Sequence, residues 1–169
     1  MTRFFSSLVL FGTLFLLSIM TPANAQINPQ GKPGDTGVGK TEHYEVWHDQ
    51  SGWHVRTFTK EYDHHFRGSI SVQGGEFEKV KGFKQEHKGA TKDAFVLGPE
   101  NKKITFDFST KGSVDGVDFH VKGETAVLKF NLLMGQKEPK FEPARIFIGE
   151  GLAHPSGDPF ELPAHVPKK

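Results

Sequence analysis

The chain has 169 residues and a nearly balanced charge, with 21 Lys and Arg against 20 Asp and Glu and a formal net charge of +1 at pH 7. This balance gives no broad electrostatic reason to bind nucleic acid or an anionic membrane, so we expect neither as a partner. The chain has no cysteine, which excludes disulfide bonds and leaves a hydrophobic core to hold the fold together.

Residues 1–25 have the pattern of a secretory signal peptide. Arg3 precedes an uncharged, mostly apolar run of 17 residues, and Ala23 and Ala25 form an A-x-A cleavage site. We therefore predict cleavage after Ala25, a secreted or periplasmic protein, and no stable membrane anchor in the mature chain. An uncleaved anchor is the alternative, because the apolar run is at the short limit of membrane-spanning length.

Residues 26–40 are rich in Gly, Pro and polar residues, which predicts a flexible leader. The leader runs into GDTGVGKT, residues 34–41, which fits the phosphate-loop pattern G-x-x-x-x-G-K-[ST]. A phosphate loop works because a buried strand precedes it and a helix begins within it. The flanking segments QINPQGKP and EHYEVWHD predict neither element, so we interpret the match as a coincidence and predict no nucleotide ligand.

Residues 41–169 are predicted to form one β domain, because short segments alternate apolar and polar residues between turn residues. Strict alternation places one face of a strand in the core and the other in water. Strands are expected at residues 52–59 and 65–73, and the second has Phe66 and Ile70 on its inward face.

Residues 76–89 fit two different structures. Phe77, Val80 and Phe83 are three residues apart, which suits a short helix. Gly82 and the Gly-Gly turn that precedes the segment suit the return strand of a hairpin with a bulge. We favour the strand and leave the helix as the alternative.

The clearest alternation lies in residues 102–133, where three segments separated by turn residues predict a central, three-stranded antiparallel meander. A register that sets Phe108 opposite Phe119 would bring the apolar side chains together on one face of this meander. The inward-facing residues would be Ile104, Phe106, Phe108, Val117, Phe119, Val121, Ala126, Leu128, Phe130 and Leu132.

The other face of the predicted meander is polar. In the same register Asp107 faces His120 and Asp118 faces Lys129, which would form favourable cross-strand pairs. Ser109 shares this face, and an Asp–His pair beside a serine is similar to a hydrolase site. We favour a solvated polar face, because no G-x-S-x-G turn or oxyanion hole can be located.

The C-terminal residues 154–169 contain four prolines, which excludes a helix and predicts an extended strap with a short edge strand near Phe160 to Leu162. Pro143 likewise predicts an edge strand or a bulge in residues 140–149. The whole pattern predicts an all-β fold of about seven to nine strands, either a single antiparallel β-sandwich or a small barrel.

Four aromatic residues near the start of the domain are the best binding candidates: Tyr44, Trp47, Trp53 and Tyr62. A hairpin turn in HDQSG would set Trp47 near Trp53 and, if exposed, the two rings would form a platform for a carbohydrate or a protein ligand. Burial in the core is the alternative, and we favour it because large aromatic side chains are mostly buried.

Nine histidines raise the question of a divalent metal, for which His48, His54, His64 and His154 are weak candidates. Zinc needs three or four converging ligands, usually at short fixed spacings, and no H-E-x-x-H motif occurs. We therefore predict no cofactor and expect scattered surface histidines, although a site assembled from distant strands stays open.

Together these patterns favour an exported, non-catalytic binding or structural module of unknown ligand. The alternative is a histidine-dependent metal-binding protein or hydrolase in the periplasm or extracellular space. A third hypothesis is a pH-responsive domain, in which carboxylates beside histidines raise the histidine pKa in the folded state.

Overall fold

The computed structural model describes residues 27–34, 42–58, 62–85, 94–111, 114–135, 142–150, 153–154 and 159–165. The predicted signal peptide and the phosphate-loop match after Gly34 lie outside these residues. Within them, no helix is long and apolar enough to cross a membrane. The helical element that they contain is the short 3₁₀ turn η1, Pro99–Asn101.

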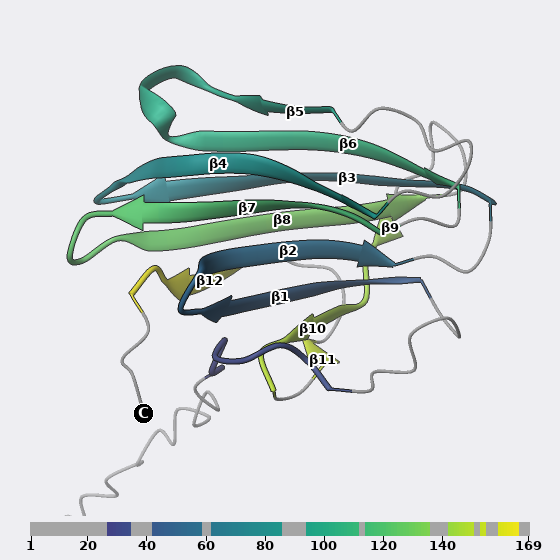
Figure 1. The fold of residues 1–169 in the computed structure, drawn as a ribbon, viewed down its shortest axis with the longest axis horizontal. Helices are drawn as coiled ribbons and strands as arrows, with labels where there is room; N and C mark the ends of the chain where they lie inside the picture. The colour runs from purple at the N-terminus through teal and green to yellow at the C-terminus, as the bar shows by residue number, and fades with distance from the viewer. Residues whose placement is uncertain are drawn as a thin grey trace, which may run out of the picture.

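The described residues form two packed β-sheets rather than a closed barrel. Ten strands have three residues or more and two have only two residues, so the predicted seven to nine strands were too few for this part of the chain. In Figure 1, β4 and β7 lie in front of β3 and β8, which belong to the other sheet. The strands are β1 (His43–Asp49), β2 (Gly52–Phe58), β3 (Tyr62–Gln73), β4 (Glu76–Gln85), β5 (Ala94–Leu97), β6 (Lys103–Lys111), β7 (Val114–Lys122), β8 (Val127–Gly135), β9 (Glu142–Pro143), β10 (Ile146–Ile148), β11 (Ala153–His154) and β12 (Phe160–Pro163).

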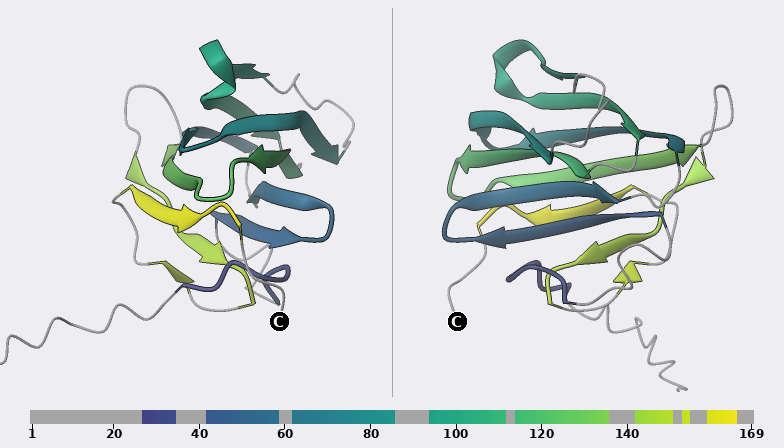
Figure 2. Two further views of the ribbon diagram at one scale, coloured as in Figure 1. Left: turned by 90° about the vertical axis from the view of Figure 1, so that its left-hand side faces the viewer. Right: turned by 45° about the vertical axis from the view of Figure 1, so that its right-hand side comes forward.

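Sheet A has the strand order β11-β10-β1-β2-β7-β4, and sheet B has the order β12-β8-β3-β6-β5 with β9 paired to β8. Strands β1 and β10 run parallel, so sheet A is mixed and the prediction of a purely antiparallel sandwich was wrong. Pro143 lies in the short strand β9, in agreement with its predicted edge position. Figure 2 shows the two layers from two further directions.

The predicted inward faces are confirmed by burial. The side chains of Phe66 and Ile70 are fully buried, and Phe106, Phe119 and Phe130 are each at most 3% exposed. All five belong to one continuous hydrophobic core between the two sheets. These five side chains therefore share a single interior, as the alternation predicts.

The predicted meander in residues 102–133 was wrong in its pairing. Its three segments are indeed the strands β6, β7 and β8, but β7 lies in sheet A, whereas β6 and β8 lie in sheet B on either side of β3. Phe108 is opposite Phe66 and not opposite Phe119. Alternation determines which side chains face the core, and a strand in either sheet satisfies the same pattern.

Residues 76–85 form a strand, β4, as favoured over the helix. The bulge is also present, because the register with β7 shifts between Glu78 and Lys81 and Lys79 has a φ of 51°. The predicted hairpin with the preceding strand was wrong, since β4 pairs with β7 in sheet A while β3 lies in sheet B. The Gly-Gly turn therefore connects the two layers.

Part of the predicted flexible leader lies against the sandwich. The His48 N–H donates to the Pro29 carbonyl (2.8 Å), and the Gly31 N–H donates to the His48 carbonyl (3.1 Å). The N-terminal stretch passes beside β1 and β10 in Figure 1 and Figure 2. For Pro29 to Gly31 the expectation of a free leader is therefore corrected, because backbone hydrogen bonds join them to sheet A.

The short edge strand expected in the C-terminal strap is present as β12, which pairs with β8. Phe160 and Leu162 on this strand are 6% and 2% exposed, so they are part of the core. The Trp53 Nε1–H donates to the Ala164 carbonyl (2.9 Å), and the Ala164 N–H donates to the Ala126 carbonyl (2.8 Å). Because Trp53 belongs to sheet A, these bonds connect the strap to both layers.

Candidate functional site

The aromatic candidates do not form an exposed platform. Tyr44 and Trp53 are 0% and 1% exposed in the core, and Trp47 is 6% exposed on the other face of sheet A. Tyr62 begins β3, and its side chain lies outside the described part of the structure. The proposed platform was therefore wrong for the three described rings, and the alternative of buried packing fits them.

The β1–β2 hairpin also separates the two tryptophans. Its register sets Trp47 opposite His54 and His48 opposite Trp53. Neighbouring pairs in a ladder point to opposite faces of the sheet, so Trp47 and Trp53 face different sides. For the same reason His48 and His54 do not converge, although they flank the same turn.

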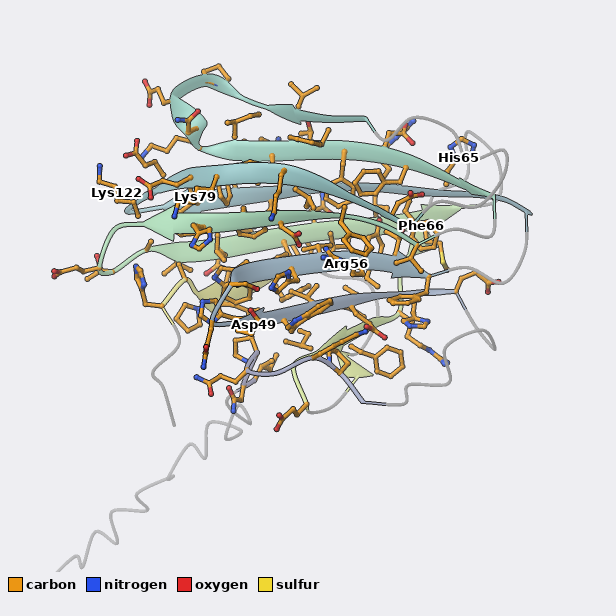
Figure 3. All side chains as sticks on the ribbon, viewed as in Figure 1. Asp49, Arg56, His65, Phe66, Lys79 and Lys122 are labelled. Atoms are coloured by element: carbon orange, nitrogen blue, oxygen red, sulfur yellow. The ribbon has the colours of Figure 1, made fainter. Side chains whose placement is uncertain are left out.

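Five polar side chains on the outer face of sheet A form a hydrogen-bonded group, here named the His54 cluster: Asp49, Ser51, His54, Arg56 and Asp118. His54 Nδ1 lies 2.7 Å from Asp118 Oδ1, while Nε2 lies 3.0 Å from Ser51 Oγ and 3.1 Å from Asp49 Oδ1. Arg56 Nη2 lies 2.7 Å from the same oxygen of Asp118. Figure 3 shows Asp49 at the end of β1 and Arg56 over β2.

The Arg56 guanidinium lies against two aromatic rings. Its guanidinium carbon lies 3.7 Å from the centre of the Phe83 ring and 5.4 Å from the Trp47 ring. The residue beneath it is Gly116, where an added Cβ would overlap the Val55 carbonyl oxygen and lie 2.9 Å from Arg56 Cδ. Glycine at this position therefore makes room for the buried guanidinium.

The charges of the His54 cluster stabilise one another. Burial lowers the pKa of His54, but hydrogen bonds to Asp118 and Asp49 raise it more, so the net shift is upward. Burial raises the pKa of Asp118, but hydrogen bonds from His54 and Arg56 outweigh this effect and the net shift is downward. The predicted partner of Asp118, Lys129, lies in sheet B, so the Asp118–Lys129 pair was wrong.

Ser51, His54 and Asp118 have the spacing of a catalytic triad, whereas the sequence pattern suggests such a group at Asp107, Ser109 and His120. In such a triad the serine donates its proton to the imidazole. Here the Ser51 hydroxyl lies closer to Asp49 Oδ1 (2.6 Å), which also accepts the Ser51 backbone N–H (2.7 Å). This arrangement is a side-chain-capped turn, and it directs the hydroxyl proton to Asp49 rather than to His54.

The metal candidates are not brought together. His48 and His54 lie on opposite faces of the hairpin, while the backbones of His64 and His154 lie in β3 and β11, in different sheets. The side chains of His64 and His154 are outside the description. Among the residues whose positions are given, no three His, Asp or Glu side chains are grouped to hold a metal ion.

An open hollow of about 440 Å³ lies on the outer face of sheet B, over β3, β5, β6 and β8; it is here named the sheet-B hollow. These strands send alternate side chains inward to the core, and the outward-facing side chains line the hollow together with Gly68 and Phe106, which occupy core-facing positions. The lining residues are Arg67, Gly68, Ser69, Val96, Thr105, Phe106, Asp107, Asn131 and Leu133.

The middle of the hollow is a row of short side chains that crosses four strands. Ser69 on β3 is opposite Asn131 on β8 and opposite Thr105 on β6, which is in turn opposite Val96 on β5. Strands in a sheet are about 4.8 Å apart, so this row is about 14 Å long. The alternation predicts that Ser69, Thr105 and Asn131 face outward, but only the register reveals that they are neighbours.

The next row of the hollow contains an ion pair. Arg67 Nε and Nη2 donate to Asp107 Oδ2 at 3.1 and 2.7 Å, and each side chain is 41% exposed. Asp107 Oδ1 lies 3.6 Å from His65 Nδ1. The predicted Asp107–His120 pair was wrong, because His120 lies on β7 in sheet A.

Comparison with known proteins identifies neither a family nor a function for this chain. No protein-family model matches the chain, and no curated protein is significantly similar to it. The geometry of the sheet-B hollow and of the His54 cluster is therefore the basis for a functional proposal.

Proposed function

We propose that this protein is an exported, non-catalytic binding module whose ligand occupies the sheet-B hollow. One observation carries the proposal: the side chains of Ser69, Thr105 and Asn131 make no hydrogen bond to another residue within the described part of the chain. A concave site of several hundred Å³ with a few convergent polar groups is the usual form of a small-ligand site. Export rests on the predicted signal peptide, residues 1–25.

The contrast between the two sheet faces supports this choice. In the His54 cluster each charged group has a partner inside the protein, which is typical of a structural network. The row through Ser69 instead offers its donors and acceptors to the solvent side of the sheet. A ligand could therefore bind there without breaking an internal hydrogen bond.

Filling the hollow tests the proposal. Ser69→Trp places a large ring in the middle of the row, whereas the control Ser71→Trp changes the same face of the same strand outside the lining. Neither side chain belongs to the core, so both variants are expected to fold. We expect a library of small polar compounds to contain binders that shift the backbone amide resonances of Ser69, Thr105 and Asn131 in the unmodified protein. The same compounds should still bind Ser71→Trp but should no longer bind Ser69→Trp. Binders that act equally on both variants would contradict the proposal.

A hydrolase is the second candidate function, and the spacing of Ser51, His54 and Asp118 is the observation that favours it. In such an enzyme Ser51 would attack an ester and pass its proton to His54. Because Asp49 accepts the Ser51 hydroxyl, we expect no reaction of the purified protein with a fluorophosphonate probe. Labelling that is lost in Ser51→Ala would establish the hydrolase and overturn the non-catalytic assignment.

A further inference from the structure

We infer that the ligand of the sheet-B hollow is a neutral saccharide; the inference rests on the proposed function and adds the chemical class of the ligand. A ligand of the hollow must match three of its properties at once: its charge, its hydrogen-bonding groups and its apolar surface.

The hollow has no uncompensated charge among its described lining residues. Arg67 is its one cationic residue, and two of the guanidinium nitrogens already donate to Asp107, its one anionic residue. A phosphate or carboxylate ligand would have to compete with Asp107 for the guanidinium, and a cationic ligand would have to compete with Arg67. A ligand without net charge can bind without competing for either member of the ion pair.

The hydrogen-bonding groups match hydroxyls. Ser and Thr hydroxyls and the Asn amide each both donate and accept, so the row of Ser69, Thr105 and Asn131 suits partners that also do both. A sugar ring presents several hydroxyls of this kind. Asp107 Oδ1, which faces His65 at 3.6 Å, provides one further acceptor at the edge of the row.

The apolar contacts match the C–H face of a sugar ring. Val96 is 64% exposed at one end of the row, and Leu133 is half-buried beside Arg67. A purely apolar ligand would leave the polar row without partners, at a cost in free energy. The length of the row, about 14 Å, is sufficient for more than one ring.

An extended peptide fits this surface less well. Peptides that bind sheets by strand addition need an edge with open backbone N–H and C=O groups. The floor of the hollow is the face of β3, whose backbone is paired with β6 on one side and β8 on the other. Recognition here depends on side chains, which again favours hydroxyl groups over a peptide backbone.

A glycan array probed with the full exported protein tests the inference. We expect binding to neutral oligosaccharides, and no binding to uronic-acid oligosaccharides or to trialanine and triglycine added as peptide probes. Titration of the best neutral glycan should shift the amide resonances of Ser69, Thr105 and Asn131. Thr105→Val, which removes one hydroxyl with little change in shape, should weaken binding about three- to tenfold, and Ser71→Ala should leave it unchanged.

Asp107→Asn provides a readout that a structural role would not produce. The variant removes the charge that balances Arg67, so the neutral glycan should bind about tenfold more weakly and uronic-acid oligosaccharides should begin to bind. If anionic glycans or the peptides bind the unmodified hollow and neutral glycans do not, the saccharide class is wrong while the binding module stands. If no compound of any class shifts the resonances of the hollow, both proposals fail.

Discussion

At the scale of single residues, His54 and His48 have pKa shifts of opposite sign. The pKa of His54 is raised by its carboxylate partners, so its contribution to stability is full below the unfolded pKa and is lost as pH rises through the folded pKa. The pKa of His48 is lowered mainly by burial, so its contribution is present above the unfolded pKa and is lost as pH falls. The two effects partly cancel in the intact protein.

Single substitutions should separate these effects. We expect His54→Gln to lower the free energy of unfolding more at pH 5.5 than at pH 8.5, because the protonated imidazole is the form that Asp49 and Asp118 stabilise. His48→Gln should have the opposite pH dependence: because it removes a half-buried imidazole whose protonation destabilises the fold, the free energy of unfolding should fall less between pH 8.5 and pH 5.5 than in the unmodified protein. Urea unfolding at the two pH values measures both differences, and equal losses for His54→Gln at both would exclude the proposed linkage.

Gly116 is a second position where a single substitution should change the stability of the fold. Gly116→Ala adds a Cβ that overlaps the Val55 carbonyl and displaces Arg56 from its contacts with Phe83 and Trp47, so we expect a loss of about 1–3 kcal/mol in unfolding free energy. Gly34→Ala is the control, since a Cβ there meets nothing within 4 Å. A stable Gly116→Ala protein would show that the backbone can yield at this point.

At the scale of strands, the sequence predicts which face of each strand is buried but not which strands pair with one another. The alternation of residues such as Phe106 and Phe119 correctly predicts that both are buried. It also predicts that Ser69, Thr105 and Asn131 point outward. It does not predict that β3 separates β6 from β8, because inward and outward positions are the same in either sheet. The sheet-B hollow depends on that arrangement, so it could not be located from the sequence.

The His54 cluster was missed for the same reason. Asp118 was paired with the wrong strand, and Ser51 lies in a turn, where alternation carries no information. Local signals were more successful, since the four prolines of the tail predicted a short edge strand, which is present as β12. Local structure could therefore be predicted from the sequence, whereas contacts between residues distant in the sequence could not.

The strap offers a test at this scale. Phe160→Ala should lower the free energy of unfolding by about 3–5 kcal/mol, because the ring stacks on Phe130 at 4.9 Å between centroids and is 6% exposed. The neighbouring variant Glu161→Ala, on the exposed side of the same strand, should change it by less than about 0.5 kcal/mol. Similar effects of the two variants in urea unfolding would mean that β12 does not complete the core.

At the scale of the whole molecule, the sandwich gives the two sheets different outer faces. The outer face of sheet A carries the internally paired His54 cluster, and the outer face of sheet B has a polar hollow of about 440 Å³. The binding proposal requires that β3 lie between β6 and β8, since no other order brings Ser69 beside both Thr105 and Asn131.

A cysteine-free chain allows this arrangement to be measured by engineered disulfides. Directly opposed residues of a sheet are close enough to be bridged after small adjustments. We expect Ser69→Cys with Thr105→Cys to oxidise to an intramolecular disulfide, detected as the loss of two hydrogen masses, and Asp107→Cys with His120→Cys to stay reduced. A disulfide in the second pair and none in the first would restore the simple meander and remove the hollow on which the proposed function depends.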